Sequence, residues 1–360
     1  MDLIVEAPVN ALSFGNVTYN FLRQFWRKNI NVLWYPLGGN ADFGVFDKID
    51  PEFKNWLETS VRKANSSIDK DMPTFKMWHI NGSQTRISSK QTLYSFYELD
   101  EPTPTEINLV KLQDKCIFSS KYAEQKFLNA GCKNVTSIPI GFDEDLSKTN
   151  KKYLGDDIVH FGLMGKYEKR KHTKKIVQLW AKKFGNNPKF QLSLCITNQF
   201  IKPEDMNKLI WDMFEGKKYN NINILPFLKS NSEVNEYLNA IDVDLSGLSG
   251  AEGWNLPAFN SSCLGKWSIV LNATSHKDWA NDKNSILVEP NGKEPVYDQM
   301  FFQKGVEYNQ GNIYTWDSDE VSDAMDKSVT LKGQNNTLGE KLKEDFSYSS
   351  SVDRILKAIV

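Results

Sequence analysis

Short apolar runs alternate with amphipathic helical patterns along almost the whole chain of 360 residues. Residues 3–8 form the first apolar run, and Val17, Phe21 and Phe25 then recur at helical spacing. Apolar runs of strand length recur at residues 30–37, 75–80, 115–120, 158–165, 190–196, 221–227, 240–248 and 267–273. Strands that alternate with helices in this way predict βαβ units and therefore parallel sheets.

A polar segment at residues 141–157 separates two such series of strands and helices. Because a domain usually has ~100–200 residues, a chain of this length is expected to form two. The predicted fold class is α/β, with two doubly wound, Rossmann-like domains at residues 1–150 and 151–340 that face each other across a cleft. Open parallel sheets bind ligands beyond the carboxyl ends of their strands, which places the expected site in that cleft. Apolar residues at helical spacing predict a last helix within residues 341–360.

The charge balance disfavours a protein that coats nucleic acid, because 44 Lys and Arg residues are offset by 45 Asp and Glu residues. No apolar run has the ~18–20 residues that a membrane span needs. The amino terminus lacks the basic region of a signal peptide. The four cysteines lie far apart without metal-site spacing, at Cys116, Cys132, Cys195 and Cys263. We therefore expect a cytoplasmic protein with reduced, mostly buried thiols.

Residues 246–273 are the most informative segment. Glu252 and Gly253 follow a predicted strand and come just before Leu256 and Pro257, where a helix is expected to begin. The backbone N–H groups at the start of a helix have no partner within the helix, so residues 253–256 predict a phosphate or hydroxyl site. A plain strand–turn–helix fits the same pattern, with Glu252 stabilising the helix dipole by ~0.3–1 kcal/mol. The sequence has no GxGxxG fingerprint and no P-loop.

This segment resembles the donor-site signature of retaining glycosyltransferases of the GT-B fold, family four. The matching positions are Ser249, Glu252, Gly253, Leu256, Pro257 and Gly265. Two positions depart from the signature, because Asn255 replaces its second glycine and Asn260 replaces its second glutamate. That glutamate normally accepts hydrogen bonds from the nucleotide ribose. An asparagine oxygen can accept a hydrogen bond but carries no charge, so the departure concerns the nucleotide contact.

Residues 158–175 resemble the strand, glycine and paired basic residues with which the same family holds the donor diphosphate. The resemblance assigns this role to Lys166 and Lys171, after Gly165, with Arg170 as a competing candidate. Between residues 166 and 183 there are eight Lys and Arg residues, so a solvated helix face is an alternative. That alternative is preferred for Lys174, Lys175, Lys182 and Lys183.

The first half contributes weaker matches. Residues 96–143 resemble the end of the family's first domain, where Pro139, Gly141 and Asp143 mark the crossover. Glu98 and His79 are candidates for the acceptor side, although each also fits a structural role. Gly15 lies in the first strand-to-helix turn, where relatives approach the transferred sugar, and the neighbouring Asn16 is a candidate helix cap.

The resemblance implies a GT-B glycosyltransferase whose last helix crosses back to the first domain. It implies transfer of a hexose, with retention, from a nucleoside diphosphate sugar to a hydroxyl of a glycan or of a modified base in DNA. Glu252, Lys166 and Lys171 are the implied catalytic residues. The implied donor-binding residues are Gly15, Gly165, Arg170, Ser249, Gly253, Trp254, Asn255, Leu256 and Asn260. No cofactor or metal is expected, because cationic side chains neutralise the diphosphate.

Two other interpretations stay open: a nucleotide-sugar-binding protein, and an epimerase-type GT-B protein without transfer. The expected compartment is the cytoplasm, or the host cytoplasm if the chain is viral. Domain closure is expected to hinge near residues 141–155. No motif names the sugar, the nucleotide, the acceptor or the oligomeric state.

Overall fold

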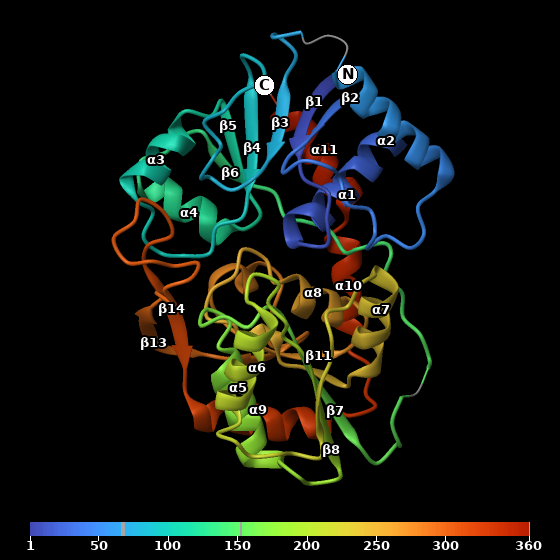
Figure 1. Ribbon diagram of the computed structural model, residues 1–360, viewed down its shortest axis with the longest axis vertical. Coiled ribbons are helices and arrows are strands. Elements are labelled where there is room, and N and C mark those ends of the chain that lie inside the picture. The colour runs from blue at the N-terminus through green and yellow to red at the C-terminus, as the bar shows by residue number, and fades with distance from the viewer. Residues whose placement is uncertain (66–68, 152, 360) are drawn as a thin grey trace.

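The computed structural model describes residues 1–65, 69–151 and 153–359. Lys152 of the predicted linker and Val360 of the predicted last helix lie outside the described residues. The chain forms two α/β halves, one above the other in Figure 1, each built on its own parallel sheet. The predicted fold class is confirmed, and the two sheets lie on either side of the polar segment that begins at residue 141.

The first half holds a sheet of six strands in the order β2-β1-β3-β4-β5-β6, with every neighbouring pair parallel. Its strands are β1 (Asp2–Ala7), β2 (Asn31–Pro36), β3 (Thr74–Met77), β4 (Gln91–Ser95), β5 (Lys115–Phe118) and β6 (Val135–Ser137). Its helices are α1 (Ser13–Arg27), α2 (Pro51–Ala64), α3 (Pro104–Lys111) and α4 (Lys121–Asn129). Strands β4 and β6 were not predicted, because QTLYS and VTS are short and carry few apolar residues.

The second half repeats the design in the order β12-β11-β10-β7-β8-β9, again with parallel pairs only. Its strands are β7 (Val159–Met164), β8 (Phe190–Cys195), β9 (Ile222–Ile224), β10 (Val243–Asp244), β11 (Trp267–Leu271) and β12 (Ile286–Val288). Its helices are α5 (Thr173–Phe184), α6 (Pro203–Met213), α7 (Asn231–Ala240), α8 (Leu256–Cys263) and α9 (Ser318–Thr330). All five strands predicted for this half are present.

An antiparallel hairpin, β13 (Pro290–Pro295) and β14 (Asn312–Trp316), leaves the second half and reaches toward α3 (Figure 1). Its connecting loop packs Val296 and Phe302 into one buried cluster with Tyr97 and Leu99 of the first half. The sequence PNGKEP gives no strand pattern, so the hairpin was not predicted. The hairpin is a second link between the two halves.

The chain then returns to the first half through α10 (Thr337–Asp345) and α11 (Tyr348–Ala358). Helix α11 lies against α1, and Ser351 Oγ donates a hydrogen bond of 2.7 Å to the Pro139 carbonyl. A side chain at Gly141 would place its Cβ 2.1 Å from the Tyr348 nitrogen, so only glycine fits this crossing. The return of the last helix, implied by the resemblance, is therefore confirmed.

Two expectations from composition are also met. All four cysteines are free thiols, and Cys116, Cys132 and Cys263 are buried. Within the described ranges, every helix is too short or too polar to cross a bilayer.

Candidate functional site

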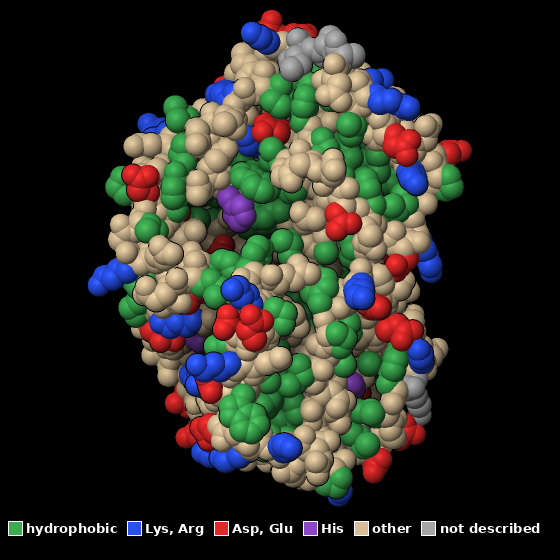
Figure 2. Space-filling view, in the orientation of Figure 1, with side chains coloured by type: hydrophobic (Ala, Val, Ile, Leu, Met, Phe, Trp, Pro, Cys, Tyr) green, Lys and Arg blue, Asp and Glu red, His purple; other side chains and the backbone are tan. Residues whose placement is uncertain are grey.

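The carboxyl ends of both sheets open onto one cleft of about 670 Å³ between the two halves. The segments after β1, β3 and β4 form its first wall, and the β7–α5 loop with residues 252–257 forms the second. Figure 2 shows the hollow, bordered above by hydrophobic side chains. This is the place predicted from the parallel sheets. Of the predicted site residues, those in the cleft wall are His79, Glu98, Lys166, Arg170, Lys171, Glu252, Gly253, Trp254, Asn255 and Leu256.

Glu252 lies in this cleft with only 6% of its surface exposed. Lys171 Nζ donates a hydrogen bond of 2.6 Å to its Oε1, and Arg170 Nη1 lies 3.1 Å from its Oε2. Burial alone would raise the pKa of Glu252, but Lys171 and Arg170 together hold that pKa well below its usual range. The carboxylate is therefore ionised and held in one orientation.

Glu168 lies buried between two cations of the same loop. Its carboxylate accepts from Lys166 Nζ at 2.9 Å and from Arg170 Nη2 at 3.2 Å. Arg170 Nε also lies 3.7 Å from Glu98 of the first half, and burial raises the pKa of Glu98. The charged cluster of the cleft therefore has three cations and three carboxylates, and its formal charge is zero (3 − 3). Its members are Lys166, Arg170, Lys171, Glu98, Glu168 and Glu252.

Gly165, at the start of the β7–α5 loop, allows the close approach of Lys171. Gly165 has φ +145°, and a Cβ there would lie 3.0 Å from Lys171 Cδ. The missing side chain at Gly165 therefore lets Lys171 fold back toward Glu252. Gly165 supports the site from beneath and does not line the cleft.

The turn before α8 carries four unpaired N–H groups. Ala258 and Phe259, in the first turn, are paired with the Asn255 side chain at 3.4 Å and with its carbonyl at 3.0 Å. Within the described residues, the N–H groups of positions 253–256 have no acceptor, as the sequence predicted. These donors lie in the cleft wall beside Glu252 and can bind an anion.

Asn255 has φ +70° and therefore a left-handed backbone, which asparagine adopts more easily than most residues. Its Nδ2 donates to the Ser246 carbonyl at 2.8 Å and lies 2.9 Å from His276 Nε2. Since His276 Nδ1 lies 2.8 Å from the Leu271 carbonyl, we assign the proton to Nδ1 and the acceptor role to Nε2. Burial lowers the pKa of His276, which favours this neutral form.

Two supporting residues were missed from the sequence. His276 fixes Asn255, but no sequence pattern connects positions 21 residues apart. Thr274 accepts the Glu252 N–H at 3.2 Å from a backbone with φ +49°, which is rare for a β-branched residue. Both lie just after β11, so only the sheet order brings them to the site.

Besides Gly165, three predicted donor-binding residues do not line the cleft. Ser249 is 2% exposed, and its Oγ donates to the Arg170 carbonyl at 3.3 Å, so it supports the loop. Gly15 lies inside α1, where a Cβ would come 2.2 Å from the Asn10 nitrogen. Asn260 is 7% exposed within α8, and its Oδ1 has no partner among the described residues.

Asn16 was expected to cap α1, and this prediction is wrong. The helix begins at Ser13 after Leu12, which makes no side-chain cap. Asn16 instead donates from Nδ2 to Asn231 Oδ1 at 3.3 Å, across the two halves.

The first wall of the cleft is aromatic. The rings of Phe14 and His79 have centroids 4.4 Å apart, and those of Phe14 and Phe96 lie 4.7 Å apart. Although part of the His79 ring is open to the cleft, partial desolvation by the surrounding walls and the Lys166 charge lower the pKa of His79. Lys166 Nζ also lies 5.2 Å and 4.8 Å from the ring centres of Phe200 and Phe301. Apart from Phe14 in α1, these aromatic residues lie in loops, and loops carry no periodicity from which a cleft can be predicted.

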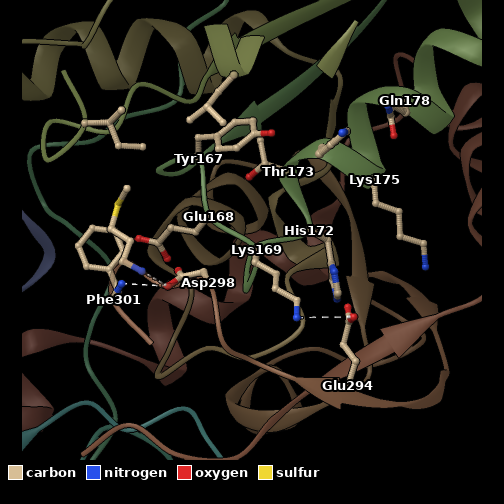
Figure 3. Close-up of a pocket in the computed structure, with 14 residues that line it drawn as sticks. Tyr167, Glu168, Lys169, His172, Thr173, Lys175, Gln178, Glu294, Asp298 and Phe301 are labelled. Carbon is tan, nitrogen blue, oxygen red and sulfur yellow. Dashed lines mark hydrogen bonds and ion pairs between the residues drawn. The ribbon is translucent and has the colours of Figure 1, made fainter. Parts of the chain in front are cut away.

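A second pocket, of about 510 Å³, lies beside the β7–α5 loop and shares Glu168 and Phe301 with the cleft wall. Figure 3 shows Lys169 pointing toward Glu294, at 3.9 Å, below the first turn of α5. The ammonium of Lys175 lies 3.6 Å from the ring centre of Trp316. This lysine is therefore bound within the protein and does not belong to a solvated face.

The solvated-face expectation holds for only part of the lysine run. Lys174 and Lys182 are exposed, whereas Lys183 is half-buried and pairs with Asp326 at 2.8 Å. Across residues 1–65, 69–151 and 153–359, no group of three or more His, Cys, Asp or Glu side chains has the geometry of a metal site.

No protein-family model and no curated protein matches the sequence. Solved structures do match over nearly the whole chain. HepE of Anabaena, in complex with UDP, has a TM-score of 0.64 at 13% identity, covering 99% of this chain and 98% of that one. Sucrose-phosphate synthase of Thermosynechococcus elongatus gives 0.68 at 11% identity, with coverage of 99% and 98%.

The catalytic domain of starch synthase IV from Arabidopsis thaliana, bound to ADP and acarbose, gives a TM-score of 0.64 at 11% identity, with coverage of 99% and 98%. At such low identity the likeness concerns the fold. Because each match covers both halves of the chain, it also covers the way in which the two halves are placed across the cleft. The chain therefore has the GT-B fold, in which two Rossmann-like halves enclose a cleft.

Proposed function

We propose that the protein is a glycosyltransferase that moves a sugar from a nucleoside diphosphate sugar to an acceptor hydroxyl. One observation carries the proposal: the buried Glu252, held by Arg170 and Lys171, adjoins four backbone N–H groups in the cleft that have no acceptor among the described residues. This arrangement offers a carboxylate for sugar hydroxyls and donors for a diphosphate. The named ligands of similar structures, UDP-glucose with HepE and ADP with starch synthase, support the same ligand class.

In this proposal the site acts mainly through electrostatics. Lys166, Lys171 and the N–H groups of residues 253–256 stabilise the negative charge that grows on the leaving diphosphate. Each such contact contributes roughly 2–4 kcal/mol to the transition state. The sugar is transferred with retention and without a metal, because cationic side chains take the role of a divalent ion. Closure of the cleft, hinged near residues 141–155, completes the site.

Without a ligand, the charged cluster of the cleft has no net formal charge. This balance determines how readily the site binds an anion. Lys171 and Lys166 are each paired with a carboxylate, Glu252 and Glu168. A bound diphosphate adds charge that these cations then share. Protonation of Glu98, whose pKa is raised by burial, leaves the cluster with one net positive charge. The raised pKa of Glu98 thus favours donor binding.

The test is nucleotide release from UDP-, GDP- and ADP-sugars without an acceptor. We expect release from one donor in the wild type, and at least 100-fold slower release in Glu252→Gln and Lys166→Ala. Lys174→Ala is the matched control, because Lys174 is exposed and does not line the cleft. EDTA is expected to leave the rate unchanged. No release together with no donor-induced thermal stabilisation would contradict the proposal.

A second candidate function is nucleotide-sugar binding without transfer. Asn260 favours it, because its buried and unpaired Oδ1 stands where the family signature has a glutamate. Calorimetry distinguishes the two functions, since a binding protein takes up the donor without releasing the nucleotide. An epimerase-type activity would instead change the released sugar when no acceptor is present. The free thiols fit the proposed cytoplasmic location.

A further inference from the structure

We propose that the acceptor is a neutral carbohydrate, whose ring packs on Phe14 and Trp78 and whose hydroxyls bond to His79. This inference rests on the proposed function and names the acceptor class for the same cleft. Two observations support it. The Lys and Arg side chains of the cleft lie on the second wall, and polar atoms of His79 and Trp78 on the first wall have no hydrogen-bond partner among the described residues.

All cationic side chains of the cleft belong to the second half. Lys166, Arg170 and Lys171 come from the β7–α5 loop. Among the described residues of the first half, those in the cleft include no Lys and no Arg, but they do include Glu98 and Glu106. A phosphorylated acceptor or a DNA backbone would find no Lys or Arg on this wall to neutralise its charge. The first wall therefore disfavours an anionic acceptor.

The same wall suits a sugar ring. Phe14, Trp78 and His79 are close together, with ring centroids 6.2 Å apart for Phe14–Trp78 and 5.4 Å apart for Trp78–His79. Phe14 and Trp78 are half-buried and His79 is exposed, so all three keep surface toward the cleft. Aromatic faces offer apolar area without ordering a long side chain, which fits the C–H face of a pyranose.

The polar atoms of this cluster are unused. Within the described residues, neither ring nitrogen of His79 nor the Trp78 Nε1 forms a hydrogen bond. The lowered pKa of His79 keeps its imidazole neutral near pH 7, with one donor and one acceptor nitrogen. An imidazole in this state can bind a sugar hydroxyl from either side. It offers little to a phosphate.

The position is also suitable for transfer. Phe96 links the two walls, because a Cβ at Gly253 would lie only 2.9 Å from Phe96 Cβ. Phe96 also lies 4.7 Å from the Phe14 ring. The aromatic cluster is therefore continuous with the turn that carries the unpaired N–H groups. An acceptor on the cluster lies beside the sugar held by Glu252.

The experiment compares methyl glucoside, methyl galactoside, maltose, glucose 6-phosphate and a 12-base-pair DNA duplex as acceptors. Saturation-transfer NMR also measures direct binding of the methyl glycosides without donor. We expect turnover of a neutral glycoside and a KM for it at least tenfold higher in Trp78→Ala, with the KM for the donor changed less than threefold. Trp78→Phe should recover most of the affinity.

Trp211→Ala is the matched control, because Trp211 is 57% exposed on α6, outside the cleft. A higher kcat/KM for glucose 6-phosphate or DNA would overturn the inference, as would an unchanged acceptor KM in Trp78→Ala. Thermal melting of Trp78→Ala and Phe14→Ala distinguishes lost binding from lost folding. Donor release without acceptor tests the proposed function separately, so failure of one is distinct from failure of the other.

Discussion

The Nζ atom of Lys171 lies 2.6 Å from Oε1 of Glu252, although the two residues are 81 positions apart. The bond joins the loop after β7 to the turn before α8, which are neighbours because β7 and β10 pair in the sheet. Each residue had been assigned its role from a separate sequence pattern. Their contact shows that the two patterns build one site, in which the cation is paired before any ligand binds.

Replacement of Glu252 by glutamine tests this pairing. Glu252→Gln keeps the shape of the side chain but removes the negative charge with which Arg170 and Lys171 both pair. We expect the free energy of unfolding to fall by about 1–3 kcal/mol, in urea titrations followed by circular dichroism. Glu236→Gln is the control, because that carboxylate pairs with Lys151 in solvent and its loss should not move the midpoint. Equal shifts in both variants would show that the buried cluster has no special stability.

The pH dependence of donor affinity tests the role of Glu98. Its pKa is raised by burial, so Glu98 stays protonated to a higher pH than an ordinary glutamate does. Rising pH ionises Glu98 and adds negative charge beside Arg170, so the Kd for an anionic donor should increase. In Glu98→Gln this increase should disappear. Calorimetric titration with UDP between pH 5 and pH 8 measures it, and the same pH profile in both proteins would contradict the role.

Most of the fold could be predicted from the sequence, and the reason is visible in particular strands. Buried parallel strands such as VHFGLM in β7 are continuous apolar runs, and these are easily recognised. Strand β6, VTS, has three residues, and β13, PNGKEP, is polar because one face is exposed. The hairpin that links the two halves is therefore invisible to periodicity, although Val296 and Phe302 become fully or nearly buried in it.

The site was only partly predictable for a different reason. Glu252 and Lys171 belong to local patterns, and both lie in the cleft. Glu168 stands in a run of basic residues that gives no sign of a special role, yet it pairs with Lys166 and Arg170 at the centre of the cluster. Its burial depends on tertiary packing, which a single sequence does not encode locally. The same holds for Asn260, whose spacing matched a motif but whose side chain is enclosed in α8.

Asn255 offers a test of backbone geometry against side-chain bonding. Its φ of +70° suits glycine, so Asn255→Gly loses the bonds to Ser246, Ala258 and His276 without new strain. Asn255→Ala loses the same bonds and adds left-handed strain of about 1–2 kcal/mol. We therefore expect the alanine variant to be less stable than the glycine variant by roughly that amount in urea titrations. A glycine variant that is the less stable of the two would show that the backbone here relaxes freely.

Asp143 lies at the crossover between the halves, and its raised pKa should make the stability of the protein depend on pH. Burial, and then the Asp145 charge, raise the pKa of Asp143 to about 6 from 3.8. Between these two values the folded protein keeps a proton that the unfolded chain has released, so this group's contribution to stability falls as pH rises through the window. Above pH 6 the contribution stays at its lower level.

Asp143→Asn removes this ionisation while its amide oxygen can still accept the Asp145 N–H, now bonded at 3.0 Å. Relative to the wild type, the free energy of unfolding of the variant should therefore increase by about 2–3 kcal/mol between pH 4 and pH 7. Urea titrations at four pH values measure this difference. Asp282→Asn is the control, because Asp282 is exposed and its variant should keep the wild-type profile. A constant difference between Asp143→Asn and the wild type would mean that Asp143 is already ionised at pH 4 in the folded protein.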